Sequence, residues 1–164
     1  MLGRMQSDAF KGGGGRGLMW DVDLRPRLEK ARKLAERGTE GLAELAQMAG
    51  SDGAEEVRIE ATRLLGTIGV SALSELEKRA RHDANLNVRT VAVETLVMLG
   101  DAAIGVLSEI AGHDGNPEIR LLSVRQLIKI GISAIPALEG RLRDGNSAIR
   151  HEAEQGIKQL ERKQ

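Results

Sequence analysis

Each of the three histidines in this chain is followed directly by a carboxylate, a pair of groups that can bind a metal ion or move a proton. The pairs are His82-Asp83, His113-Asp114 and His151-Glu152. One imidazole and one carboxylate are too few ligands for a metal centre, and no Ser-His-Asp order offers a nucleophile. A histidine at a helix C-terminus is favoured by the helix dipole, which is a purely structural role. We therefore predict no catalytic residue, no metal site and no cofactor, and we expect that the protein is not an enzyme.

A second charged pattern places an arginine six residues after an aspartate, four times along the chain. Its members are Asp52, Asp83, Asp114 and Asp144, followed by Arg58, Arg89, Arg120 and Arg150. A carboxylate in a turn and a guanidinium just inside the next helix can form bidentate hydrogen bonds within or between repeats. Because such paired networks seldom leave a reactive group free, we interpret the pattern as a structural ladder.

The elements that carry these residues repeat along the chain. Similar segments begin at Val57, Val88, Ile119 and Ile149, at intervals of 31, 31 and 30 residues. Glycines recur at the 31-residue interval too, at Gly38, Gly69, Gly100 and Gly131, and each can take the left-handed conformation that ends a helix. A period of this size is typical of a solenoid, in which each repeat covers the apolar face of its neighbour.

Each repeat predicts two helices, each with one apolar face. The first helix has apolar residues at i and i+3, in the pairs Leu42/Leu45, Leu73/Leu76, Ile104/Leu107 and Ile135/Leu138. The second helix has core residues at offsets of 0, 4, 8 and 11 from its Val or Ile, with a small residue at the second position. Asn85, Asn116 and Asn146 are predicted N-caps of second helices, whereas the first repeat has Ala54 there.

Composition limits the classes of function. Lys plus Arg equals Asp plus Glu at 24 each, so no net field attracts nucleic acid or an anionic membrane. There is no cysteine, which excludes disulfides and thiolate chemistry. No segment approaches the roughly 20 apolar residues that span a bilayer, and the N-terminus lacks a signal-peptide pattern. We expect a cytoplasmic protein that has no membrane partner.

Residues 1–20 are predicted to be a glycine-rich, flexible N-terminal tail. The stretch GGGGRG is not a phosphate-binding loop, because Gly17 is followed by Leu18 rather than by Lys and Ser or Thr. Trp20 either folds onto the open end of the first repeat or anchors a partner.

Helical pairs of about 31 residues with Asp in the turn, [VI]-R-x-x-[AS] opening the second helix and a late Gly resemble the HEAT-like repeats named after phycobilin lyases. The resemblance implies an all-α fold, a right-handed α-α superhelix of four helical-pair repeats with an N-terminal capping helix. We place the solenoid at 21–164, with the cap helix at about 24–37 and repeats at about 39–69, 70–100, 101–131 and 132–162. The segment at Ile149 is similar to the His-Glu repeats of deoxyhypusine hydroxylases, but the matching positions of the other repeats carry no His-Glu pair.

The outward positions of the second helices are predicted to bind a segment of another protein. The candidate residues are the apolar Val91, Met98, Leu121 and Leu122 and the charged Arg63, Glu94, Arg125 and Lys129. Alternatively, these apolar residues pack against adjacent repeats. The resemblance also implies a second function, a subunit of a bilin lyase or isomerase. A third is nucleic-acid binding through the basic cap helix, which zero net charge and the scarcity of aromatic residues argue against.

Overall fold

The computed structural model describes residues 23–162, so the glycine-rich tail and the roles predicted for Trp20 lie outside the described residues. Nine α-helices make up most of the described chain. They are α1 (Arg25–Glu36), α2 (Leu42–Ser51), α3 (Glu55–Ile68), α4 (Leu73–His82), α5 (Leu86–Leu96), α6 (Ile104–His113), α7 (Pro117–Ile130), α8 (Ile135–Glu139) and α9 (Ser147–Glu161). Short 3₁₀ segments, η1 (Gly38–Glu40), η2 (Val70–Ala72), η3 (Val97–Ala103) and η4 (Ile132–Ala134), lead into the even-numbered helices.

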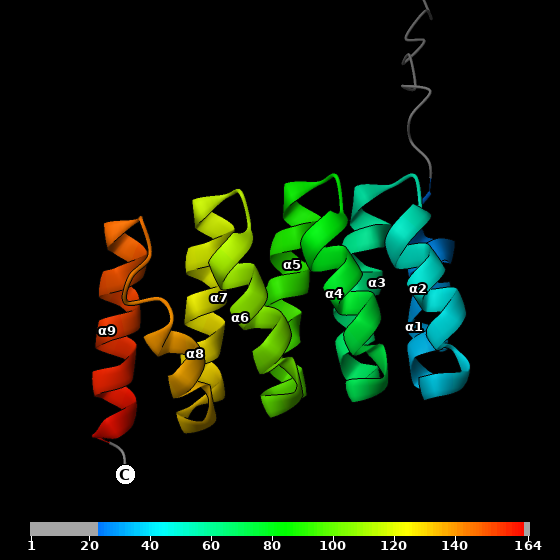
Figure 1. Cartoon of the computed structure of the whole chain (residues 1–164). Coiled ribbons are helices and arrows are strands. Elements are labelled where there is room, and N and C mark those ends of the chain that lie inside the picture. The colour runs from blue at the N-terminus through cyan, green and yellow to red at the C-terminus, as the bar shows by residue number, and fades with distance from the viewer. Residues whose placement is uncertain (1–22, 163–164) are drawn as a thin grey trace, which may run out of the picture.

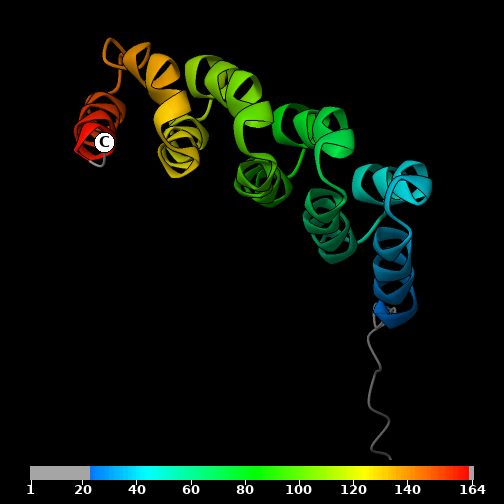
Figure 2. The same cartoon turned by 90° about the horizontal axis from the view of Figure 1, so that it is seen from below.

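The helices form two layers that follow the order of the sequence. Figure 1 shows α1 to α9 side by side from one end of the array to the other. Seen from below, the odd-numbered helices make up the inner, concave layer and the even-numbered helices the outer layer (Figure 2). This all-helical α-α superhelix is the fold that the 31-residue period predicted. Helix α1 takes the place of an inner helix, with no outer helix before it in the described chain.

A continuous apolar core fills the space between the layers. In the outer helices Leu45, Leu76, Leu107 and Leu138 are all fully buried. In the inner helices the residues at offset 0, which are Val57, Val88, Ile119 and Ile149, are also buried, as are the small residues Ala61, Ala92, Ser123 and Ala153. The predicted core faces are therefore confirmed, and the small residues allow the two layers to approach closely.

The turn from each inner helix to the next outer helix depends on a glycine with positive φ. The values are 59° at Gly38, 84° at Gly69, 56° at Gly100 and 116° at Gly131. The predicted positive φ is thus confirmed, but ψ is −153° at Gly69, −137° at Gly100 and −151° at Gly131. The fully left-handed conformation was a wrong prediction for these three residues, because that conformation has a positive ψ. Their backbone lies near a region that glycine alone normally occupies, so a side chain would strain the turn.

Three of the inner helices begin at an asparagine whose side chain caps the first turn. Oδ1 of Asn85 accepts from the backbone N–H of Asn87 at 2.8 Å, and Asn116 and Asn146 cap their helices in the same way. These N-caps are confirmed. Ala54 has almost the same backbone angles as Asn85 (φ −92°, ψ 126° against φ −92°, ψ 124°) but no side-chain acceptor. The first turn of α3 therefore has no side-chain N-cap.

Ala54→Asn is expected to stabilise the protein by about 1 kcal/mol, the usual contribution of an asparagine N-cap. The backbone at position 54 already has the extended conformation that a capping asparagine needs, so no rearrangement is required. Urea unfolding measures the change, and the reverse replacement Asn116→Ala should lose a similar amount. An Ala54→Asn variant that is no more stable than the parent would show that the turn before α3 cannot place the amide oxygen.

The Asp and Arg ladder forms, but with different bonds from those predicted. Nη1 of each arginine donates to the backbone carbonyl of the aspartate in its own repeat, at 2.8 Å for Arg58 and Asp52 and 2.9 Å for Arg120 and Asp114. The aspartate Oδ1 instead accepts from the backbone N–H two residues later, for example at 2.9 Å from Ala54. The bidentate guanidinium–carboxylate pair was therefore a wrong prediction within a repeat. The same turn recurs in the repeats at Asp83/Arg89 and Asp144/Arg150.

Two contacts extend the ladder between neighbouring repeats. Arg120 Nη2 lies 3.7 Å from Asp144 Oδ1, in the next repeat. At the other end, Arg27 Nη1 lies 2.5 Å from Asp52 Oδ1. Arg27 stands 31 residues before Arg58 and therefore occupies the position of the ladder arginines in α1. The ladder predicted from the sequence began only at Arg58. These bonds fix the stacking of adjacent turns.

At two of the interfaces between consecutive outer helices, an arginine packs over a glycine of the preceding helix. Arg79 of α4 lies over Gly50 of α2, because a Cβ atom at Gly50 would come within 2.9 Å of Arg79 Nη1. A Cβ atom at Gly112 of α6 would overlap Nη1 of Arg141 in the same way. Between α4 and α6 the two positions are occupied by Arg81 and Ile110 instead. The first and third interfaces between outer helices are therefore alike, and the second differs.

The last outer helix is shorter than predicted. The sequence predicts a helix over 132–143, but α8 ends at Glu139 and the chain continues through turns to Arg143. The last period is one residue shorter than the others, and Gly140 stands where the helix stops. Glycine is a poor helix former, so the helix ends there and the turn absorbs the missing residue.

The C-terminal helix presents a polar face at the end of the array. The same register position is occupied by Thr62, Val93 and Val124 in the three preceding inner helices, and all three are fully buried. In α9 this position is Glu154, which is exposed, and α9 is the last inner helix of the described chain. The hydrogen bond from Lys158 Nζ, at 2.5 Å, holds the pKa of Glu154 below its usual range. A polar terminal face of this kind keeps a repeat array from growing by end-to-end stacking.

One segment of the described chain, Leu86–His113, has the length and apolarity of a membrane span. It is not one straight helix, because Gly100 has non-helical backbone angles and separates α5 from α6. Half of its most apolar window is buried within the stack. Its apolar character is therefore explained by the core that α5 and α6 build together.

Candidate interaction surface

The charged residues predicted to bind a partner are brought together on the concave side of the array. We call this surface the inner face and define it as the exposed side chains of α1, α3, α5, α7 and α9 together with Met98, which follows α5 in η3 (Figure 2). Arg63 lies on α3, Glu94 on α5, and Arg125 and Lys129 on α7, and all four are exposed. They come from three successive inner helices, so a ligand would have to span three repeats to touch them all.

The apolar candidates differ in their exposure. Met98, just after α5, has 59% of its surface exposed, the most of the four. Leu121 and Leu122 of α7 are half-buried and pack against the core. Val91 is only 7% exposed, so its prediction as an outward residue was wrong. The inner helices pack closely enough to cover a side chain as small as valine.

Ion pairs link neighbouring inner helices at both ends of the inner face. Arg32 Nε of α1 lies 3.6 Å from Glu60 Oε1 of α3. At the other end, Arg125 Nε of α7 lies 3.3 Å from Glu152 Oε1 of α9. The two pairs occupy equivalent positions, because Arg32 and Arg125 lie in one register column and Glu60 and Glu152 in another. Solvent-exposed pairs of this kind contribute little to stability, typically about 0–1 kcal/mol, but they satisfy the charges.

In the middle of the inner face, the residues equivalent to these arginines and glutamates do not form ion pairs. Arg63 is the next residue in the Arg32 column, but the acceptor position opposite it is Val91. Glu94 follows in the same column, and the position opposite it is Leu122. Within residues 23–162, neither Arg63 nor Glu94 forms an ion pair. The centre of the inner face therefore combines one unpaired cation, one unpaired anion and the exposed side chain of Met98.

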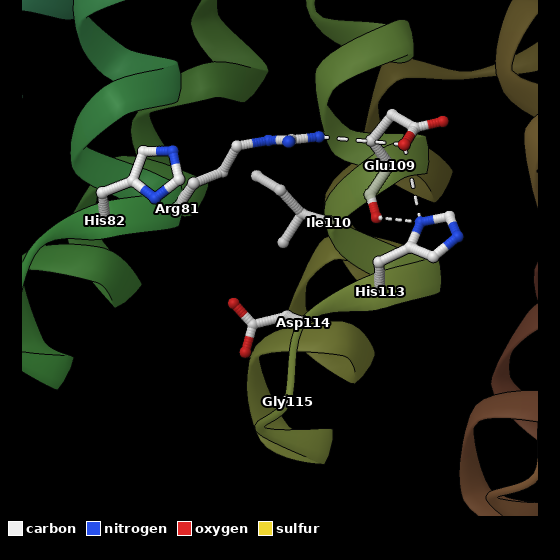
Figure 3. A pocket seen from close by; sticks show the side chains of 7 residues that line it. All are labelled: Arg81, His82, Glu109, Ile110, His113, Asp114 and Gly115. Atoms are coloured by element: carbon white, nitrogen blue, oxygen red, sulfur yellow. Dashed lines mark hydrogen bonds and ion pairs between the residues drawn. The ribbon is translucent and has the colours of Figure 1, made fainter.

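A hollow of about 410 Å³ lies on the outer layer between the C-terminal ends of α4 and α6. It brings together His82, His113 and Asp114 of the predicted histidine–carboxylate pairs, although the sequence did not predict a hollow there. It is lined by Arg81, His82, Glu109, Ile110, His113, Asp114 and Gly115 (Figure 3). The hollow is found where Arg81 and Ile110 replace the glycine and arginine of the neighbouring interfaces. A departure from the repeat was the signal that could have located it.

Two ion pairs join Arg81 and His113 to Glu109 in this outer hollow. Arg81 Nη2 lies 3.8 Å from Glu109 Oε2, and His113 Nδ1 lies 3.5 Å from the same oxygen (Figure 3). The lining residues include no serine, threonine, cysteine or lysine that could act as a nucleophile. Among the described residues no group of three or more His, Cys, Asp or Glu side chains could hold a metal ion.

A family model described as HEAT repeats matches residues 21–97 and 73–158. Among solved structures, a chain in "the complex of CpcE and CpcF of phycocyanin lyase from Nostoc sp. PCC7120" is similar to this chain, with a TM-score of 0.55 and 20% sequence identity. The similarity covers 77% of this chain and 85% of that chain. No curated protein matches. At this level of identity the structural likeness concerns the fold alone.

Proposed function

Since the chain belongs to the HEAT repeat family, we propose that it is a non-catalytic interaction module that binds a segment of another protein along the inner face. Repeat arrays present extended concave surfaces, and they use these surfaces for binding. The observation that carries the proposal is the exposed side chain of Met98 beside two unpaired charges, at the centre of a surface whose ends are paired and polar. Apolar surface with a polar rim is typical of protein interaction sites.

A second candidate function is a subunit of a bilin lyase or isomerase. It is favoured by the likeness in fold to a chain of the phycocyanin lyase complex. Fold alone does not determine activity, so the likeness makes this the alternative. Co-expression with a phycobiliprotein and its bilin tests it, because a lyase subunit changes the colour or bilin content of the product. An unchanged product, with the protein present and folded, would remove this alternative.

Nucleic-acid binding is less well supported because the basic residues of α1 are engaged in ion pairs. Lys30 Nζ lies 2.6 Å from Glu44 Oε1, and this hydrogen bond holds the pKa of Glu44 below its usual range. Arg27 and Arg32 also face carboxylates of the following repeat. A phosphate-binding surface needs cations that are free to displace counterions, and here carboxylates compete for them.

Met98→Asp is expected to reduce partner recovery at least about tenfold, because a carboxylate at the apolar centre must be desolvated on binding. Met98 is a better probe than Leu122, because Leu122 packs against the core and an aspartate there would also disturb folding. Quantitative co-purification from the native host measures recovery. Ser74→Asp, an exposed site on α4 in the outer layer, is the matched control. Equal recovery by both variants and the parent would show that the partner does not use the inner face.

A further inference from the structure

The inner face also indicates what its partner looks like, an inference that rests on the proposed function. We propose that the partner segment is an amphipathic helix with an acidic residue that meets Arg63 and a basic residue that meets Glu94, about seven positions further along. An apolar residue between them contacts Met98. The proposal follows from the interrupted pairing of the two register columns.

Arg63 and Glu94 form no ion pair because the residues opposite them on the next inner helix are apolar. Where the opposite residue is a glutamate, as at Glu60 and Glu152, the arginine pairs with it across the helix interface. Where the opposite residue is Val91 or Leu122, no such bond is possible. The charges at the two central positions are therefore available, and they have opposite signs.

An occupant that covers Met98 must also satisfy these two charges. Covering an unpaired charge removes its hydration without replacing it, which disfavours binding. A segment with counter-charges in the right order avoids this, and a segment with the reverse order brings like charges together. The order of charges on the inner face therefore selects among partners and sets the direction in which a partner helix lies.

The spacing of the two charges fits one face of a helix. Arg63 and Glu94 are at equivalent positions on α3 and α5, and packed helices lie roughly 8–10 Å apart. A partner helix that crosses α3 and α5 rises about 1.5 Å per residue, so residues i and i+7 are about 10 Å apart and on the same face. Residues i+3 and i+4 lie between them and supply the apolar contact.

The test uses a display library of helical peptides with a randomised face, selected separately on three proteins. The first is the parent protein, and the second carries Arg63→Glu and Glu94→Arg. The third carries Glu75→Lys and Lys78→Glu, which exchanges a pair 2.7 Å apart on α4 in the outer layer and leaves the inner face unchanged. The first and third should enrich peptides with an acid at i and a base at i+7. The second should enrich the opposite order.

Affinity measurements then separate this inference from the proposed function. A peptide selected on the parent should bind the exchanged variant at least about tenfold more weakly, and exchange of its own two charges should restore binding. Binding that is lost in Met98→Asp but does not respond to the exchange at positions 63 and 94 would overturn the inference and leave the inner face as the binding site. Peptides insensitive to all of these changes, or no enrichment of helical peptides, would overturn both.

Discussion

Replacement of Val124 by glutamate is expected to lower the free energy of unfolding by about 4 kcal/mol at pH 7. Val124 is fully buried in the inner layer, so a carboxyl there would have to stay protonated. Keeping a glutamic acid neutral costs about 1.4 kcal/mol for each pH unit above its ordinary pKa of about 4.3. The raised pKa in the folded state makes the loss grow with pH, and the loss should shrink as the pH falls towards about 4.3. Urea unfolding at several pH values measures it.

The matched control is Glu154→Val, the reverse exchange at the same register position of the terminal helix. Glu154 is exposed, so its replacement should change stability by less than about 0.5 kcal/mol. It should instead promote self-association, because it leaves an apolar surface on the last helix. Sedimentation velocity detects this. If Val124→Glu is tolerated as well as Glu154→Val, the inner helices do not pack through this position.

Leu96→Ala is expected to lower the free energy of unfolding by about 3 kcal/mol. Leu96 of α5 is fully buried in the middle of the core, and truncation of such a leucine leaves a cavity that the surroundings only partly fill. Because each repeat contacts only its neighbours, the loss should fall on the second repeat and its two interfaces. Hydrogen exchange should then show faster opening of α4 and α5 than of α9.

Met98→Ala is the control for the cavity variant, since Met98 lies two residues away and is 59% exposed. Its effect should be within about 0.5 kcal/mol. A uniform increase in exchange along the whole described chain after Leu96→Ala would show that the array unfolds as a single cooperative unit. A loss below about 1 kcal/mol would show that the core around α5 can collapse onto the smaller side chain.

The fold was predictable from the sequence because the period repeats both its apolar and its capping residues. Positions such as Val88 and Leu76 are buried in every repeat, so a single pattern fixes the register of both helices. The N-caps were equally clear, since Asn116 and its equivalents stand at the one place where an inner helix can begin. The exception at Ala54 was also predictable, because the first repeat has alanine where the other repeats have the capping asparagine.

The candidate surface was less predictable, because its residues lie at the border between solvent and the helix interfaces. Val91 and Leu122 share one register column, yet Val91 is buried and Leu122 only half-buried. Side-chain size and the local distance between helices decide exposure at such a position, and a sequence pattern gives neither. The pairing of Arg125 with Glu152 likewise depends on how neighbouring helices are aligned.

The bonds of the ladder were mispredicted for a different reason. A turn that begins with Asp114 offers an arginine two acceptors, the carboxylate and the backbone carbonyl. The backbone N–H of Asn116 donates to the carboxylate, because the two groups are only two residues apart in a tight turn. Arg120 of the same repeat donates to the carbonyl of Asp114, whereas a carboxylate of this column accepts a guanidinium from the inner helix before it, as Asp52 does from Arg27. The sequence shows which groups are present but not which helix supplies each donor.

The arginines that lie over Gly50 and Gly112 imply that this array is built in doublets. Repeats one and two form one matched set and repeats three and four another, and the seam between the sets has Arg81 and Ile110. A designer who wishes to lengthen the protein should therefore duplicate a whole doublet, such as residues 39–100. Insertion of a single repeat would place an arginine equivalent to Arg79 or Arg141 against a residue that has a side chain, although the arginine packs only over a glycine.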